Sequence, residues 1–201
     1  MVLLVIASVV AVGLIVERAW TLRRLVILPP AVQAAVEQCR TLQDIELVER
    51  VCRQQPSPLS RLLLLASEHR DWPRDENADS LQTQARHEVV RMERGLVVLE
   101  IVVGIAPLLG LVGTIHGLIT LFGDMGKAGL GNNTEMARGV AIALNTALGG
   151  LLTAIPALIA WSSLSKKVEN LAVEMELVCD EFLRRVYRTA RDAGSKESRT
   201  P

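Results

Sequence analysis

Three long apolar stretches divide the chain. Residues 1–16 carry no charge, residues 96–122 carry only Glu100, and residues 139–164 carry none. A bilayer core about 30 Å thick needs about 20 helical residues. The second and third stretches are long enough, and Ala19-Trp20-Thr21-Leu22 can extend the first. The pattern therefore predicts three transmembrane helices.

The first stretch could instead be a signal peptide. It lacks a basic start and an A-x-A cleavage site, and Arg18, Arg23 and Arg24 follow it rather than precede it. We interpret it as a membrane anchor. It begins at Met1 with no flank outside the membrane, so the sequence leaves open whether the natural chain starts upstream.

The polar segment between the first two stretches shows helical periodicity. Apolar residues recur every three or four positions through residues 31–54, which predicts one helix. Ser57 suits the N-cap of a second helix, with Pro58 at its first position and Leu59–Glu68 following. The breaker Asp71-Trp72-Pro73 comes next.

Apolar residues at helical spacing continue beyond the second and third spans into the neighbouring polar segments. One such stripe runs from Leu81 straight into the second span, and the other leaves the third span and reaches Val186. These stripes predict two long helices that pack against each other in a helical bundle below the membrane. The final residues, 194–201, are polar and are expected to be disordered.

The fold class that follows is an all-α membrane protein, with three transmembrane helices of which two extend into a cytoplasmic helical bundle. Its parts are a first transmembrane helix (1–22), a cytoplasmic helical insert (23–95), a second transmembrane helix (96–122), a periplasmic loop (123–135), a third transmembrane helix (136–164) and a cytoplasmic helix with a disordered tail (165–201).

The distribution of basic residues predicts the orientation. Arg18 and residues 23–95 hold 12 of the 22 Lys and Arg, residues 162–201 hold 8, and Lys127 and Arg138 are the other two. The positive-inside rule places the two large segments in the cytoplasm and the N-terminus outside. The expected location is the bacterial inner membrane.

Composition narrows the function further. Lys+Arg and Asp+Glu both count 22, so no basic excess indicates nucleic acid as a partner. Cys39, Cys52 and Cys179 form no CxxC pair and are expected to be free thiols. The sequence has no P-loop, GxSxG or HExxH motif, so we expect no enzyme, catalytic residue, metal site or cofactor.

Small and polar residues mark the second and third spans. Gly110, Gly113 and Gly117 recur at steps of 3 and 4, so they share a face that permits close helix contact. The residues assigned to helix packing are Pro107, Gly110, Gly113, Gly117, Gly149 and Pro156. The polar side chains at depth are Thr114, Asn145, Thr146 and Thr153. They can serve as interhelical hydrogen-bonding groups or as the wall of a narrow hydrated path.

These motifs carry a resemblance. APLLGLVGTIHGL (106–118) and ARGVAIALNTALGGLLTAIPA (137–157) resemble the second and third spans of the MotA/TolQ/ExbB proton-channel family, closest to ExbB/TolQ-like members. The resemblance implies a homopentamer around a central pore that holds single-span ExbD/TolR-like subunits with a membrane Asp. Proton flow would drive a TonB- or TolA-like periplasmic protein. The lining residues it implies are Thr114, Ile142, Asn145, Thr146 and Thr153.

One position departs from this family's pattern. ExbB and TolQ members usually carry Glu where this chain has Ile142, and Ile cannot relay a proton. MotA-type members manage without that Glu. The ionisable residues left in the spans are Glu100, near the cytoplasmic side, and His116, which lies about 200° from Thr114 on its helix. Two readings stay open: a pore-forming subunit of a proton-driven motor, and a non-conducting pentameric scaffold that has lost the proton path. Whether H⁺ or Na⁺ moves is open as well.

Overall fold

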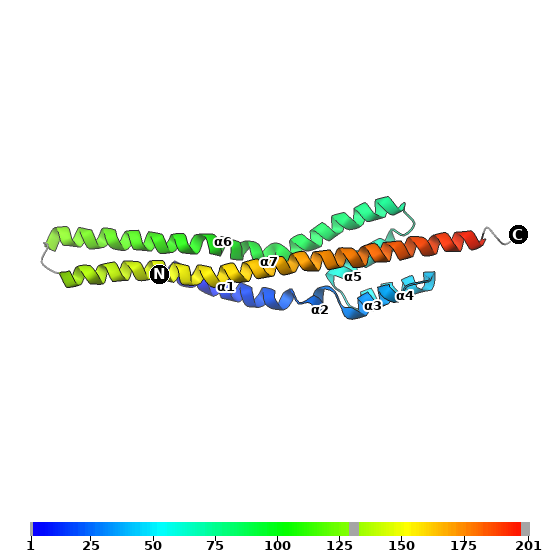
Figure 1. Ribbon diagram of the computed structural model, residues 1–201, viewed down its shortest axis with the longest axis horizontal. Coiled ribbons are helices and arrows are strands. Elements are labelled where there is room, and N and C mark those ends of the chain that lie inside the picture. The colour runs from blue at the N-terminus through cyan, green and yellow to red at the C-terminus, as the bar shows by residue number, and fades with distance from the viewer. Residues whose placement is uncertain (1, 129–132, 198–201) are drawn as a thin grey trace. The chain divides into compact units, whose positions relative to one another are not determined.

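A computed structural model describes residues 2–128 and 133–197, although not the side chains of residues 42, 124–128, 133–135 and 190–197. All regular structure in this part is helical, which confirms the all-α prediction (Figure 1). The helices are α1 (Val2–Thr21), α2 (Arg24–Ile27), α3 (Pro30–Gln38), α4 (Leu42–Gln54), α5 (Pro58–Glu68), α6 (Arg74–Ala128) and α7 (Asn133–Glu197).

Three of these helices are long and apolar enough to cross a membrane, as the sequence predicts. They are α1, the part of α6 within Arg74–Gly123 and the part of α7 within Met136–Thr189. Large apolar side chains on all three are exposed, including Val9 at 67%, Ile119 at 66% and Leu152 at 64%. Exposed aliphatic side chains on an apolar helix are the surface that contacts lipid.

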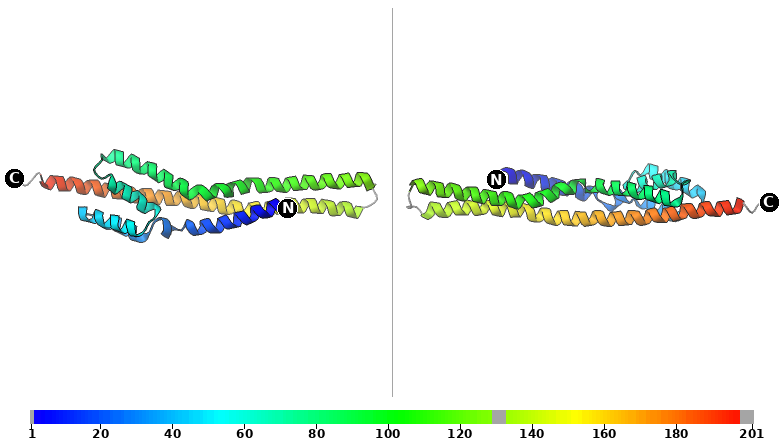
Figure 2. Two further views of the ribbon diagram at one scale, coloured as in Figure 1. Left: turned by 180° about the vertical axis from the view of Figure 1, so that it is seen from behind. Right: turned by 90° about the horizontal axis from the view of Figure 1, so that it is seen from above.

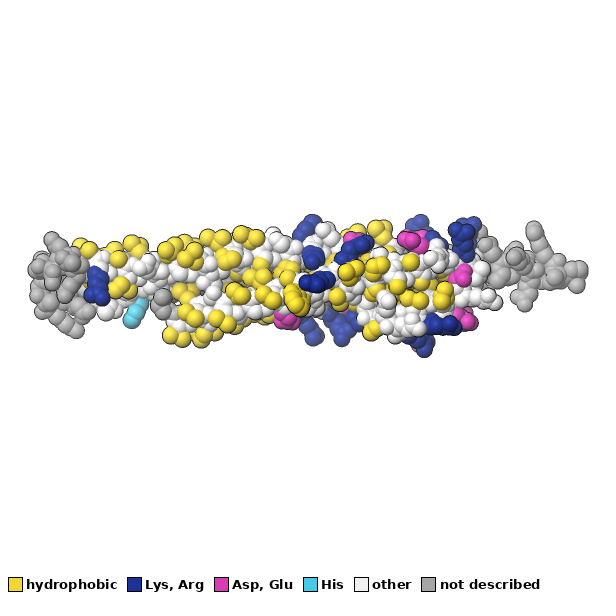
Figure 3. All heavy atoms as spheres, turned by 90° about the horizontal axis from the view of Figure 1, so that it is seen from below, with side chains coloured by type: hydrophobic (Ala, Val, Ile, Leu, Met, Phe, Trp, Pro, Cys, Tyr) yellow, Lys and Arg dark blue, Asp and Glu magenta, His cyan; other side chains and the backbone are white. Residues whose placement is uncertain are grey.

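The chain forms two compact units, and α6 and α7 contribute to both. The membrane unit consists of the described residues of Met1–Trp20 and Arg94–Ser165. The helical unit consists of those of Thr21–Glu93 and Lys166–Pro201. On the face drawn in Figure 3, hydrophobic side chains cover most of the membrane unit, and charged side chains gather over the helical unit.

The helical unit corrects one prediction. Residues 31–54 form two helices, α3 and α4, because a capping box interrupts them. The Thr41 hydroxyl accepts a hydrogen bond from the Asp44 amide, and the Asp44 carboxylate accepts one from the Thr41 amide at 2.8 Å. Both bonds satisfy amide groups that a new helix leaves unpaired. The apolar period continues across the break, which is why periodicity alone predicted one helix.

Two other boundaries agree with the sequence. The Ser57 hydroxyl caps α5 by accepting a hydrogen bond from the Ser60 amide at 3.0 Å, and Pro58 is the first helical residue. The predicted breaker at Asp71–Pro73 separates α5 from α6. The core of this unit is apolar and includes Val32, Ile45, Leu59, Leu62, Met175 and Phe182, all buried.

Two predicted irregular segments are shorter than expected. Helix α6 continues to Ala128 and α7 begins at Asn133, so only residues 129–132 of the predicted loop 123–135 lie outside the described residues. Helix α7 also extends to Glu197, so residues 194–197, half of the tail that was expected to be disordered, are helical. Once a helix is established, each further residue adds a hydrogen bond, which offsets the cost of about 1 kcal/mol for a glycine.

Candidate pore-forming helix pair

Helices α6 and α7 run side by side through the membrane unit (Figures 1 and 2). Glycines on α6 make the contact. A Cβ placed on Gly110 meets the Ala147 Cα at 3.2 Å, and one placed on Gly117 meets the Ala143 Cβ at 3.1 Å. A Cβ on Gly113 falls 2.2 Å from Cγ2 of Thr146, where no atom fits. The three glycines therefore pack against α7 of the same chain.

Small residues on α7 complete this seam. A Cβ on Gly150 falls 2.7 Å from the Ala106 carbonyl oxygen. Ala143, Ala154 and Ala157 are buried. The other residues assigned to packing behave differently: a Cβ on Gly149 meets no atom within 4 Å, Pro107 is half-buried and Pro156 is exposed. Both prolines lie inside continuous helices.

The hydroxyls of Thr114, Thr146 and Thr153 donate hydrogen bonds to backbone carbonyls. Thr114 donates to the Gly110 carbonyl of its own helix and to the Ala143 carbonyl of α7, both at 3.1 Å. Thr146 donates to the Ile142 carbonyl at 3.1 Å, and Thr153 to the Gly149 carbonyl at 3.0 Å. In this arrangement each hydroxyl keeps its acceptor lone pairs free.

Thr114 and Thr146 lie toward opposite edges of the seam. Gly113 faces Thr146, whereas Gly110 faces Ala147. Thr114 is one residue beyond Gly113 and bonds to the Ala143 carbonyl, so it points to the side of Ala147. We call the side of Thr114 and Ala147 the Thr114 edge, and the side of Gly113 and Thr146 the Gly113 edge.

Helix α1 contacts α6 at Gly95, on the side of α6 that carries the Gly113 edge. The Arg18 guanidinium crosses α6 at Gly95, where a Cβ would fall 2.0 Å from Nε. Gly95 and Gly113 are about five helical turns apart, so they face the same side of α6. The buried Nε of Arg18 has no hydrogen-bond partner within the described residues. The sequence did not predict this contact. Its only signal in the sequence is Gly95 itself, the residue just before the second span.

The remaining candidates occupy distinct positions. Glu100 is exposed and about four turns from Thr114, so it shares the Thr114 edge. Ile142 is 58% exposed and Thr146 only 9%. His116 and Asn145 are both exposed. Thr146 faces Gly113, and Ile142 is one helical turn from Thr146, so both lie on the other side of the seam from Thr114. That these residues line one path with Asn145 and Thr153 stays a prediction.

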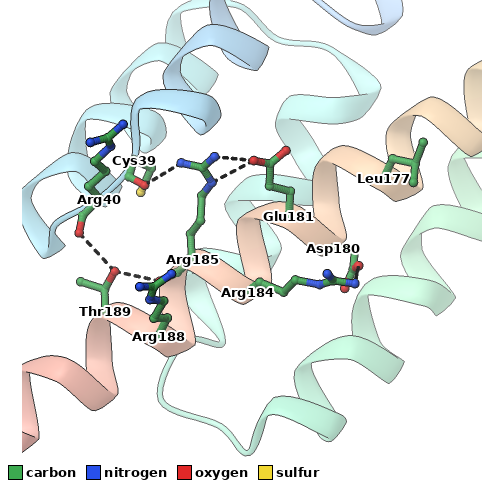
Figure 4. A pocket seen from close by; sticks show the side chains of 9 residues that line it. All are labelled: Cys39, Arg40, Leu177, Asp180, Glu181, Arg184, Arg185, Arg188 and Thr189. Carbon is green, nitrogen blue, oxygen red and sulfur yellow. Dashed lines mark hydrogen bonds and ion pairs between the residues drawn. The ribbon is translucent and has the colours of Figure 1, made fainter.

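The helical unit contains a polar hollow of about 860 Å³ between α7 and the turn that joins α3 to α4 (Figure 4). Arg185 forms an ion pair with Glu181 and donates to the carbonyls of Glu37, at 2.6 Å, and Cys39. Arg184 pairs with Asp180 at 2.7 Å. These bonds tie α7 to α3, which is a structural role.

The helical unit also holds the three thiols. All three cysteines are free and buried, as predicted for their redox state. Burial raises the pKa of Cys52 to about 11 and that of Cys179 to about 12. The described residues contain no group of three or more His, Cys, Asp or Glu that could hold a metal ion.

Known proteins resemble the chain across both units. The profile of the MotA/TolQ/ExbB proton channel family matches residues 49–177, well over half of the chain. An ExbB-like biopolymer transport protein of Synechocystis sp. is 30% identical over 188 residues, covering 89% of this chain and 74% of that protein. ExbB of Helicobacter pylori is 33% identical over 87 residues, covering 43% of this chain and 60% of that protein. The Tol-Pal system protein TolQ of Haemophilus influenzae is 31% identical over 103 residues, covering 51% and 45%.

Proposed function

Because the chain belongs to the MotA/TolQ/ExbB proton channel family, we propose that it is the pore-forming subunit of a proton-driven motor. The family is a transport and channel family rather than an enzyme family. The motor would lie in the bacterial inner membrane and work through a single-span ExbD/TolR-like partner that carries a membrane Asp. A homopentamer would surround that partner and energise a TonB- or TolA-like periplasmic protein.

The observation that carries this proposal is the α6–α7 seam with Thr114 at its edge. Close glycine contacts hold the two helices as one rigid pair, and Thr114 keeps lone pairs free within the second span. Since α1 contacts the same side of α6 at Gly95, a pore lined only by α6 and α7 would face the Thr114 edge. A neutral Asp of the partner could donate a hydrogen bond to the Thr114 oxygen there.

Glu100 gives this edge a second polar group. It lies about four turns from Thr114, on the side of α6 that leads to the helical unit. A carboxylate at this level can accept protons that leave the partner's Asp on the cytoplasmic side. The same orientation keeps residues 23–95 and 162–201 in the cytoplasm and the N-terminus outside.

A second candidate function is a non-conducting pentameric scaffold. The observation that favours it is Ile142, which is 58% exposed in a helix segment, 139–164, without any ionisable residue. If the chain instead forms a proton-conducting pore, the partner's Asp carries the proton, and water and the Thr114 hydroxyl relay it. Helix α7 then needs no carboxylate.

Flux through two threonine variants tests the proposal. The complex with an ExbD/TolR-like subunit is placed in liposomes, and proton uptake is measured for Thr114→Val and Thr146→Val. Loss of one hydrogen bond of about 1.4 kcal/mol on the path corresponds to a roughly tenfold slower flux for Thr114→Val. Thr146→Val, buried in the seam, is the matched control and keeps most of the flux. Equal and measurable flux for Thr114→Val and the unaltered chain would show that the Thr114 hydroxyl is not on the path, whereas no flux from either complex would favour the scaffold.

A further inference from the structure

The short helix α2 carries exposed apolar side chains on the helical unit. Leu25 is 67% exposed and Val26 51%, whereas Leu22 and Ile27 on either side of them are buried. One face of this segment therefore packs into the helical unit, and the other presents two neighbouring aliphatic side chains. Two such side chains are not a binding site by themselves, so their surroundings decide what they contact.

The chain keeps these side chains close to the membrane. Helix α1 has 20 residues, about 30 Å, which equals the thickness of a bilayer core, so an α1 that crosses the bilayer ends at the edge of the hydrocarbon. Leu25 is four residues beyond Thr21, the last residue of α1, and four residues span at most about 14 Å. The headgroup layer beyond the hydrocarbon is about 5–8 Å thick. Leu25 and Val26 are therefore within reach of this layer.

The lipid-facing surface of α1 continues along the chain toward α2. Val16 and Trp20, one helical turn apart, are 53% and 67% exposed. A tryptophan at the end of a transmembrane helix favours the boundary between membrane and water, because its ring is apolar and its N–H is polar. The exposed apolar side chains of α2 thus follow directly after a surface that contacts lipid.

Positive charge accompanies the exposed face of α2. Arg23 and Arg24 are exposed, and residues 18–36 contain three arginines but no Asp or Glu. The Nε–H of Arg24 donates to Glu174 at 2.8 Å, which ties α2 to α7, and a guanidinium has further N–H groups that can bind a phosphate. Aliphatic side chains beside arginines are typical of helices that lie at the surface of a membrane with anionic lipids.

We propose that residues 23–26 anchor the helical unit in the leaflet next to it. Leu25 and Val26 enter the lipid, and the guanidinium groups of Arg23 and Arg24 bind the phosphates of anionic phospholipids. The anchor sets the distance of the helical unit from the bilayer. It requires only that α1 crosses the membrane, so it depends neither on proton conduction nor on the direction in which α1 crosses.

Quenching of a thiol-bound fluorophore tests the apolar contact. The full chain with Leu25→Cys is labelled in liposomes of phosphatidylcholine and phosphatidylglycerol, and the quenchers are aqueous iodide and a lipid with a nitroxide near its headgroup. Leu177→Cys is the matched control, because Leu177 is 65% exposed but lies 13 residues, about 20 Å along α7, beyond Leu164 at the end of the third span. The unaltered chain, whose cysteines are buried, is the blank.

The anchor predicts that the lipid quencher acts severalfold more strongly on Leu25→Cys than on Leu177→Cys, and iodide more weakly. Val26→Cys, the second position, should behave as Leu25→Cys does. Equal iodide quenching at Leu25 and Leu177 would place α2 in water and overturn the anchor. A label at Leu25 that neither quencher reaches would also overturn it, because protein such as a neighbouring copy would then cover α2.

Lipid preference tests the arginines. The nitroxide is carried either by phosphatidylglycerol or by phosphatidylcholine, and the ratio of quenching of the Leu25→Cys label gives the preference for anionic lipid. Arg23→Gln with Arg24→Gln should lower this ratio about fivefold, the effect of about one arginine close to an anionic membrane surface. Arg184→Gln, the matched control, should leave it unchanged, since Arg184 also pairs with an acidic residue of α7, Asp180, at 2.7 Å. Equal quenching by the two lipids with both arginines present would overturn the phosphate contact.

Discussion

At the scale of single residues, the packing of α6 against α7 in the membrane unit depends on glycines, which have no Cβ atom. Gly113 leaves room for the Thr146 methyl group, and Gly150 leaves room for the Ala106 carbonyl. The spacing of the glycines could be predicted from the sequence, because steps of 3 and 4 place them on one face. Which helix they meet could not be predicted, because the period says nothing about the opposite partner.

Gly113→Ala should destabilise the helix pair. The added Cβ falls 2.2 Å from Cγ2 of Thr146, and overpacking of this kind costs about 1–3 kcal/mol. We expect a lower thermal unfolding temperature in detergent. Thr146→Ser removes that methyl group and should recover most of the loss.

Gly149→Ala is the matched control for that series. A Cβ there meets nothing within 4 Å, so the unfolding temperature of the isolated subunit should stay the same or rise slightly. A larger loss for Gly149→Ala than for Gly113→Ala would contradict the assignment of the seam.

A second residue-scale feature is the pair of Glu88 and Arg61 in the helical unit. The Glu88 side chain is 1% exposed and accepts two hydrogen bonds from Arg61, which hold the pKa of Glu88 below its usual value. A carboxylate with a depressed pKa contributes stability above its unfolded-state pKa, about 4.3, and loses it as the pH falls through its folded-state value.

Glu88→Gln should therefore lower the unfolding free energy at pH 7, by about 2 kcal/mol for two charge-assisted hydrogen bonds. The difference from the unaltered protein should shrink at pH values below 4. Unfolding of both proteins across this pH range checks the sign. A difference that stays constant from pH 7 to pH 3 would contradict the role of the ionised carboxylate.

At the scale of elements, local sequence signals predicted some helix ends correctly, whereas other helix ends could not be predicted from them. The Ser57 cap and the Asp71–Pro73 breaker were readable because Pro and Ser restrict the backbone directly. The Thr41–Asp44 capping box was missed because the apolar period of α3 continues into α4. Residues 123–128 and 133–135 were predicted as part of a loop but are helical, because glycine lowers helix propensity without abolishing it.

The attachment of α7 to α3 makes an element-scale prediction. Arg185 donates to the carbonyls of Glu37 and Cys39 while Glu181 holds its guanidinium. Arg185→Ala should lower the unfolding free energy of the helical unit by about 1–2 kcal/mol, discounted because the pair is partly exposed. Arg184→Ala, whose side chain is 70% exposed, should change it by less. Equal effects of the two variants would show that the carbonyl bonds contribute nothing.

At the scale of the whole molecule, the family and the three spans were readable from sequence, because long apolar stretches and paired span motifs are strong signals. Which edge of the α6–α7 seam would face a pore could not be predicted from the sequence. It depends on where α1 lies, and the Arg18–Gly95 contact that locates it joins residues far apart in sequence. The contacts within the α6–α7 seam place Thr114 and Thr146 toward opposite edges, whereas the sequence had grouped them together.

The orientation of the molecule makes its own prediction. Because 20 of the 22 Lys and Arg lie in Arg18 and residues 23–95 and 162–201, Asn132 should lie outside. A thiol introduced by Asn132→Cys should react with a membrane-impermeant maleimide in intact spheroplasts. Labelling only after the membrane is opened would reverse the orientation.

The most direct test of the central claim is proton flux through the purified complex. Liposomes carry this chain together with an ExbD/TolR-like subunit, and an imposed membrane potential drives protons across. The account predicts uptake well above that of liposomes with this chain alone, and its loss when the membrane Asp of the partner is changed to Asn. Uptake no greater than that of protein-free liposomes, from a complex that is intact, would contradict it.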